Sequence, residues 1–109
     1  MRGLRATNGV VEQVTDQEIM DAKAQVDGAG IGAEPASCAT VAGLRKLVQK
    51  GVVPHDVRVC GILTGHLLKD PDATVNYHRA AIDGIVSNFG NQPLQARGEL
   101  AEVLKLIRG

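Results

Sequence analysis

Residues 57–63 (VRVCGIL) constrain the fold of this chain more than any other segment. They form a mostly apolar run that is bounded by Pro54 and Asp56 on one side and by Thr64 and Gly65 on the other. Such a run is typical of a strand covered on both faces, as the strands of a parallel sheet are. The sequence therefore predicts that this segment lies inside a layered α/β structure.

The region before this strand predicts one shorter strand and two helical segments. Residues 1–8 resemble the end of a helix, and residues 10–14 have the pattern of a short strand. Thr15 and Glu18 have the spacing of a capping box, which predicts a helix over residues 16–26. The apolar stripe of this helix is narrow, so we expect it to lie on the surface.

Two further helices complete the expected set. Pro35 suits the first turn of a helix over residues 35–50, whose first half is rich in small residues that allow close packing. Residues 99–108 place apolar side chains on one helical face. The element order indicates an α/β fold, with a partial three-layer parallel sheet and flanking helices. Residues 1–109 should form a single domain or a fragment of one, since the sheet looks incomplete.

Charge and composition argue against several classes of protein. Twelve basic side chains balance twelve acidic ones and only 2% of residues are aromatic, so neither nucleic acid nor a membrane is an expected partner. The first twenty residues lack the apolar block of a signal peptide. We expect Cys38 and Cys60 to be reduced, buried thiols of a cytoplasmic protein, with a disulfide or a metal pair as the alternative.

Two polar stretches are not explained by the rules for helices or strands. The first is residues 34–37 (EPAS), and the second is residues 64–71 (TGHLLKDP), directly after the carboxyl end of the predicted strand. Open α/β sheets bind ligands at this end of their strands. The second stretch gathers a hydroxyl, an imidazole, an ammonium and a carboxylate, which favours a functional loop over a purely structural turn.

With a third motif, these stretches resemble the threonine synthases, which are fold-type II enzymes that use pyridoxal 5'-phosphate (PLP). The motifs are Val-Thr-Asp-x-Glu-Ile at residues 14–19, Glu-Pro-Ala-Ser at 34–37 with Val-Ala-Gly-Leu at 41–44, and Leu-Thr-Gly-His-x-Leu-Lys-Asp-Pro at 63–71. The resemblance runs from about residue 9 to residue 71 and more loosely beyond. It implies the C-terminal part of the large domain of such an enzyme.

The resemblance implies that the hydroxyl of Thr64 faces the pyridine nitrogen of PLP, and that Glu34 and Gly65 also line the cofactor. A neutral hydroxyl does not hold that nitrogen protonated as a carboxylate would, so the ring becomes a milder electron sink. From the residues alone, Thr64 could instead cap the end of the strand. Glu34 could likewise make only a charge interaction with a helix terminus.

Three further side chains are candidates for supporting the substrate phosphate or the loop itself: Ser37, His66 and Lys69. Ser37 could equally cap the helix that begins near Pro35. His66 and Lys69 could serve only to hold the loop. The histidines show no spacing that suits a metal ion, so no metal site is predicted.

Two departures from the family pattern matter. The family usually has glycine at the position of Leu67, which affects how the loop turns. The Ser-Phe-Lys-Asp motif, whose lysine forms the Schiff base, and the loop that holds the cofactor phosphate do not occur in these 109 residues. Because that chemistry needs the amine within bonding reach of one carbon, another lysine cannot replace it. We therefore assign no catalytic residue and expect this chain alone to bind no cofactor.

The implied activity of the parent enzyme is conversion of O-phospho-L-homoserine and water to L-threonine and phosphate. This chain would supply one wall of the site, and its partners would be the N-terminal part of the same enzyme and that substrate. Alone, we expect it to be inactive and to self-associate through exposed apolar surface. The alternatives are a non-catalytic, stand-alone binding module and a part of a sister PLP enzyme such as threonine dehydratase.

Overall fold

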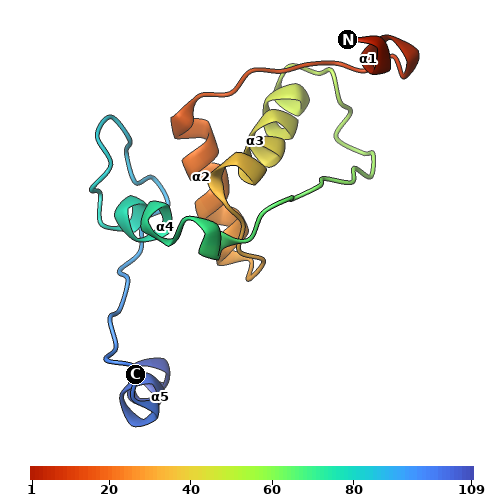
Figure 1. Ribbon diagram of the computed structural model, residues 1–109. Coiled ribbons are helices and arrows are strands. Elements are labelled where there is room, and N and C mark those ends of the chain that lie inside the picture. Colours follow the sequence, from red (N-terminus) through yellow and green to blue (C-terminus); the bar gives the residue numbers. More distant parts are fainter.

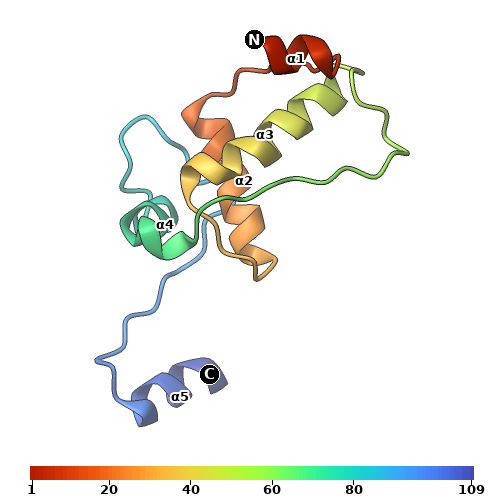
Figure 2. The same ribbon diagram turned by 45° about the vertical axis from the view of Figure 1, so that its right-hand side comes forward.

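Two packed helices form the centre of the molecule (Figures 1 and 2). In the computed structural model, which describes residues 1–109, helix α2 spans Asp16–Gly28 and helix α3 spans Pro35–Gln49. The remaining elements are α1 (Arg2–Ala6), the short 3-10 turn η1 (Leu67–Lys69), α4 (Pro71–His78) and α5 (Leu100–Arg108). None of these helices has the length and apolar character that crossing a membrane requires.

The predicted capping box at the start of α2 is confirmed. The amide of Thr15 donates to Oε2 of Glu18 at 2.8 Å, and the amide of Glu18 donates to Oγ1 of Thr15 at 3.2 Å. These two bonds satisfy amides that have no partner within the helix. The helix therefore begins where the sequence predicts, and it ends two residues later than expected, at Gly28.

The prediction that α2 lies on the surface is wrong. Half of the ten buried residues belong to this helix: Met20, Ala22, Lys23, Ala24 and Val26. Its Val26 packs with Cys38 of α3 on one side, and its Met20 and Ala24 pack with Tyr77 of α4 on the other. Alanine contributes little to a hydrophobic stripe in the sequence, yet it is buried fully when helices approach from two sides.

Helix α3 begins at Pro35, as the sequence predicts. Its small residues Cys38 and Ala42 are 0% and 4% exposed. Because these side chains are short, the backbones of α2 and α3 can approach closely. The expectation of close packing from the first half of α3 is therefore confirmed.

The two predicted strands do not form a sheet. Residues 57–63 run as an extended and mostly exposed segment whose end approaches α3, where the hydroxyl of Thr40 donates to the carbonyl oxygen of Ile62 at 3.5 Å. Residues 10–14 are also extended without a partner strand. One isolated antiparallel bridge, between Ala33 and His66, is the only pairing of β type. A strand is held by hydrogen bonds to a neighbouring strand, and neither segment has such a neighbour in this structure. For the same reason Cys60, which we expected to be buried, is exposed.

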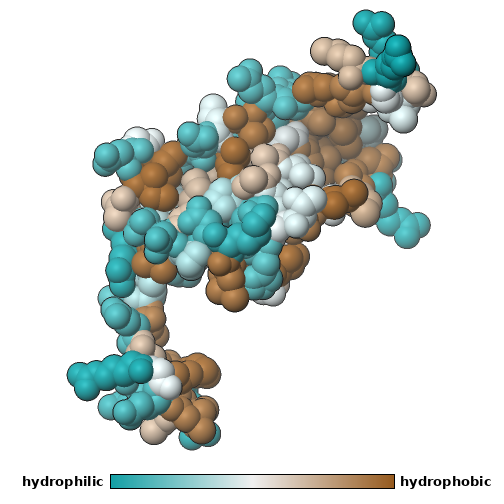
Figure 3. All heavy atoms as spheres, viewed as in Figure 1, coloured by the Kyte–Doolittle hydropathy of each residue, from teal (hydrophilic) through white to brown (hydrophobic).

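The molecule is elongated, with extents of 55 × 27 × 27 Å. Helix α5 lies at one end, beyond an extended segment that begins near residue 90, and α1 lies at the other (Figures 1 and 2). The predicted apolar face of α5 is largely uncovered, since Leu100 and Ile107 are each 74% exposed. Figure 3 shows apolar side chains gathered on α5 and again near α1.

Candidate functional site

The two polar stretches that the sequence singles out meet at the start of α3. The amide of Glu34 donates to the carbonyl oxygen of Gly65 at 3.0 Å, and the amide of Leu67 donates to the carbonyl oxygen of Gly32 at 3.3 Å. These bonds form the antiparallel bridge between Ala33 and His66. Residues about thirty positions apart in the sequence are thereby joined along their backbones.

Ser37 fixes the loop that contains Thr64. Its hydroxyl oxygen accepts hydrogen bonds from the amide of Thr64 at 3.1 Å and from the amide of Gly65 at 2.8 Å. The side-chain oxygen of Thr64 lies 3.2 Å from the same hydroxyl. Ser37 is 2% exposed, whereas Thr64 lies at the surface. Ser37 thus does not cap its own helix, whose N-cap is Glu34 without a side-chain cap bond.

Glu34 and Lys69 form an ion pair at the mouth of the site. The Nζ atom of Lys69 lies 2.8 Å from Oε2 of Glu34. The side chain of Lys69 is 62% exposed and that of Glu34 is 16% exposed. The carboxylate of Glu34 occupies the space where a side chain at Gly65 would begin. A side chain at position 65 would therefore have to displace the carboxylate of Glu34.

His66 and Asp70 hold the ends of the turn that follows. The ring atom Nδ1 of His66 accepts a hydrogen bond from the amide of Leu68 at 3.2 Å, which caps η1. Oδ1 of Asp70 accepts from the amide of Ala73 at 3.1 Å, which caps α4. His66 therefore makes a capping bond within the loop, and any role of His66 toward a substrate stays a prediction.

The structure also accounts for leucine at position 67. Leu67 has no positive φ angle, so its backbone does not require glycine. Its side chain lies over Gly32, which does have a positive φ of 69° and has no room for a side chain of its own. The unusual conformation thus falls on Gly32, and Leu67 packs against it.

One set of contacts that supports the site was missed by the sequence analysis. The Nζ atom of Lys23, which is 1% exposed, donates to Oδ2 of Asp27 at 2.7 Å and to the carbonyl oxygen of Ala33 at 2.8 Å. Oδ1 of Asp27 accepts from the amide of Ala33 at 3.1 Å. The i, i+4 spacing of Lys23 and Asp27 was visible in the sequence, but nothing there marked the pair as buried.

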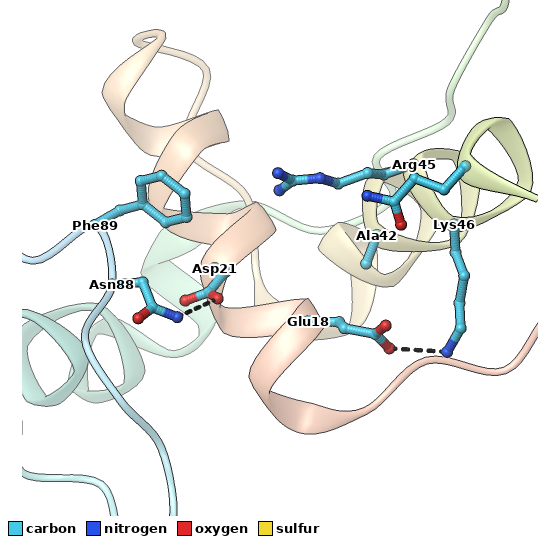
Figure 4. A pocket seen from close by; sticks show the side chains of 8 residues that line it. Glu18, Asp21, Ala42, Arg45, Lys46, Asn88 and Phe89 are labelled. Carbon is cyan, nitrogen blue, oxygen red and sulfur yellow. Dashed lines mark hydrogen bonds and ion pairs between the residues drawn. The ribbon is translucent and has the colours of Figure 1, made fainter.

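A separate hollow of about 350 Å³ lies between α2, α3 and the loop after α4 (Figure 4). Figure 4 shows Asp21 bonded to Asn88 and Glu18 paired with Lys46 in this hollow. None of the six predicted site residues lines it. No group of three or more His, Cys, Asp or Glu side chains in the chain is arranged to hold a metal ion.

Comparison with known proteins shows which family this chain resembles. No family model matches the chain. A threonine synthase from Methanosarcina acetivorans is 49% identical over 77 residues, which is 70% of this chain and 19% of the relative. This chain is homologous to a segment of the threonine synthases. A stretch that covers 70% of 109 residues includes residues 34–76 wherever it begins, so the whole cluster from Glu34 to Lys69 lies within the match.

Other threonine synthases show the same partial match. The enzyme of Methanocaldococcus jannaschii is 46% identical over 64% of this chain, and threonine synthase 2 of Arabidopsis thaliana, described as chloroplastic, is 29% identical over 96% of it. The chain spans about one fifth of the length of these relatives. The likeness therefore concerns one segment of a threonine synthase, and the predicted family is confirmed.

Proposed function

We propose that this chain forms one wall of a threonine synthase active site, together with segments that supply the reactive lysine and the phosphate loop. One observation carries the proposal. The hydroxyl of Thr64 is exposed and is held at 3.2 Å from the buried hydroxyl of Ser37, within the stretch of this chain that matches a threonine synthase. The proposed overall reaction is the conversion of O-phospho-L-homoserine and water to L-threonine and phosphate.

The residues present suit the pyridine end of PLP. When bound, PLP supplies an electron sink that weakens bonds at the substrate carbons next to its amine. The hydroxyl of Thr64 is a neutral group that can form a hydrogen bond with the ring nitrogen, and no carboxylate is hydrogen-bonded to it in the structure. We propose that Gly65 and Glu34 shape the wall beside Thr64, because glycine at position 65 leaves the space that the Glu34 carboxylate fills.

Lys69 is the group we assign to the substrate phosphate. Its side chain is 62% exposed, so its ammonium can turn from Glu34 toward an anion without leaving water. Only the Lys69 end of this ion pair is well exposed, so water can solvate its ammonium during such an exchange, while Glu34 stays in place. We propose that His66 keeps its loop-capping role and positions Lys69 through η1.

The sheet predicted from the sequence belongs to the same proposal. Residues 57–63 are already extended, and Val57, Val59 and Ile62 are 48%, 51% and 71% exposed. We propose that this segment joins a parallel sheet in the complete enzyme, with Thr64 at its carboxyl end. Ligands of open α/β sheets bind at that end of the strands.

The cytoplasmic location expected from the sequence also remains a prediction.

A chimeric enzyme tests the proposal. The aligned 77-residue segment of the Methanosarcina acetivorans threonine synthase is replaced by the matching residues of this chain, and PLP binding is measured by the visible absorbance of the purified protein. We expect a yellow protein that binds PLP. Thr64→Val should raise the dissociation constant of PLP about five- to tenfold, the effect of one hydrogen bond, while Thr64→Ser should restore it.

The same measurement separates the proposed function from its alternatives. A folded chimera that stays colourless would favour a non-catalytic binding module and count against the proposal. A chimera that binds PLP but releases ammonia from threonine, and no phosphate from O-phospho-L-homoserine, would favour a threonine dehydratase. The three relatives described above are all named threonine synthases, which supports the proposed reaction.

A further inference from the structure

The hydrogen bonds around the buried hydroxyl of Ser37 determine the direction in which it donates. Its oxygen accepts hydrogen bonds from the amides of Thr64 and Gly65, at 3.1 and 2.8 Å. A hydroxyl oxygen has two lone pairs, so both are in use. The hydroxyl hydrogen of Ser37 is then free to donate, and the remaining neighbour is the side-chain oxygen of Thr64, 3.2 Å away.

The direction of the Ser37–Thr64 hydrogen bond follows from this count. Ser37 is the donor and Thr64 is the acceptor, although either oxygen could donate on distance alone. The hydroxyl of Thr64 makes no other hydrogen bond in the structure, so its own hydrogen is left for a group that approaches from the exposed side. A hydroxyl that already accepts one hydrogen bond is also a stronger donor, because hydrogen bonds in a chain polarise one another.

We infer that Ser37 is a positioning residue that fixes the Thr64 hydroxyl as a hydrogen-bond donor to a lone pair on the pyridine nitrogen. The inference rests on the proposed function, since it takes PLP as the approaching group. Because both lone pairs of the Ser37 oxygen are occupied, the Thr64 hydroxyl cannot donate toward Ser37, and its hydrogen is turned to the exposed side. Without Ser37, nothing fixes the rotation of the Thr64 hydroxyl. Ser37 touches neither substrate nor cofactor, and its effect passes through Thr64.

The test must separate this effect from the support that Ser37 gives the loop. The chimera described above is loaded with PLP that carries ¹⁵N in the ring, and the ¹⁵N chemical shift reports whether that nitrogen is protonated. We expect the shift of an unprotonated nitrogen that accepts a hydrogen bond. Ser37→Ala should change this shift and raise the dissociation constant of PLP about five- to tenfold, as loss of one hydrogen bond would.

A double-variant comparison supplies the readout that a purely structural role would not give. In the Thr64→Val background, Ser37→Ala should cause no further change in the ¹⁵N shift, because the hydroxyl that it orients is already gone. A further change of equal size would overturn the inference. Ser37→Thr keeps the hydroxyl and should keep the shift, so it provides an answer even if Ser37→Ala fails to fold.

Failure of the inference and failure of the proposed function look different. If the unsubstituted chimera folds and binds no PLP, the proposed function fails, and the inference fails with it. If it binds PLP and the ring nitrogen is protonated, the inference alone is contradicted, because a protonated nitrogen has no lone pair for Thr64 to donate to. Both outcomes are read from the unsubstituted chimera, without any change at Ser37.

Discussion

The ammonium of Lys23 lies 2.8 Å from the carbonyl oxygen of Ala33, the residue directly before Glu34. The same ammonium pairs with Asp27 at 2.7 Å, and Lys23 is 1% exposed. Asp27 in turn accepts the amide of Ala33 at 3.1 Å. One ion pair of α2 thus binds both the amide and the carbonyl group of Ala33. It thereby fixes the backbone directly before Glu34, the first residue of the candidate site.

Removing the Lys23 ammonium should unfold this region. Lys23→Met keeps most of the volume of the side chain but leaves the Asp27 carboxylate without its buried partner. Breaking a buried ion pair in this way costs about 3–5 kcal/mol. We expect a loss of about that size in the free energy of unfolding, measured by urea denaturation of the 109-residue chain. Lys105→Met, on exposed α5, is the matched control and should change little. Equal effects of the two substitutions would contradict the role given to Lys23.

Gly65 and Gly43 should respond to alanine in opposite directions. A side chain at Gly65 would overlap the carboxylate of Glu34, while nothing lies within 4 Å of the corresponding position at Gly43. Gly65→Ala should therefore destabilise the protein by about 1–3 kcal/mol and separate Glu34 from the loop. Gly43→Ala, inside α3, should stabilise it by roughly 0.5–1 kcal/mol. Thermal unfolding of both variants checks this, and a harmless Gly65→Ala would show that the loop does not need to approach Glu34.

We expect the ionisation of Tyr77 to lower the free energy of unfolding at alkaline pH. Burial, and then the hydrogen bond of its hydroxyl to Asp21 at 2.6 Å, raise the pKa of Tyr77 above its ordinary value. In the unfolded chain the phenol ionises near pH 10, so the stability from this group is complete below about pH 10 and is lost as the pH rises toward the folded pKa.

Because Tyr77 is the only tyrosine and tryptophan is absent, the phenolate absorbance reports this residue alone in the isolated chain. We expect ionisation later than in the urea-unfolded chain. Tyr77→Phe should weaken the dependence of stability on pH above pH 10. Identical titration curves for the folded and unfolded chains would show that the hydroxyl is not held by Asp21.

Local signals in the sequence located the helices and brought the candidate site together. The capping pair Thr15 and Glu18 fixed the start of α2, and Pro35 fixed the start of α3, because both act within one helical turn. The motif residues from Glu34 to Lys69 were expected in one site, and the structure joins them through Ser37 and Gly65. Their roles toward cofactor and substrate stay predictions.

Features that depend on distant partners could not be predicted in the same way. The apolar run of residues 57–63 has the composition of a buried strand, but a strand forms only where neighbours in register bond to it. Cys60 is exposed for that reason. Burial of Lys23 likewise depends on the turn that places Ala33 above α2, and a lysine in a sequence gives no sign of it.

Product formation by the chimeric enzyme tests the central claim most directly. The chimera that carries the residues of this chain in the Methanosarcina acetivorans threonine synthase is incubated with PLP and O-phospho-L-homoserine, and threonine and phosphate are measured together. We predict that both products appear in equal amounts, and that Thr64→Val lowers their rate of formation while Thr64→Ser retains most of it. A folded chimera that forms neither product, or whose rate is unaffected by Thr64→Val, would contradict the account.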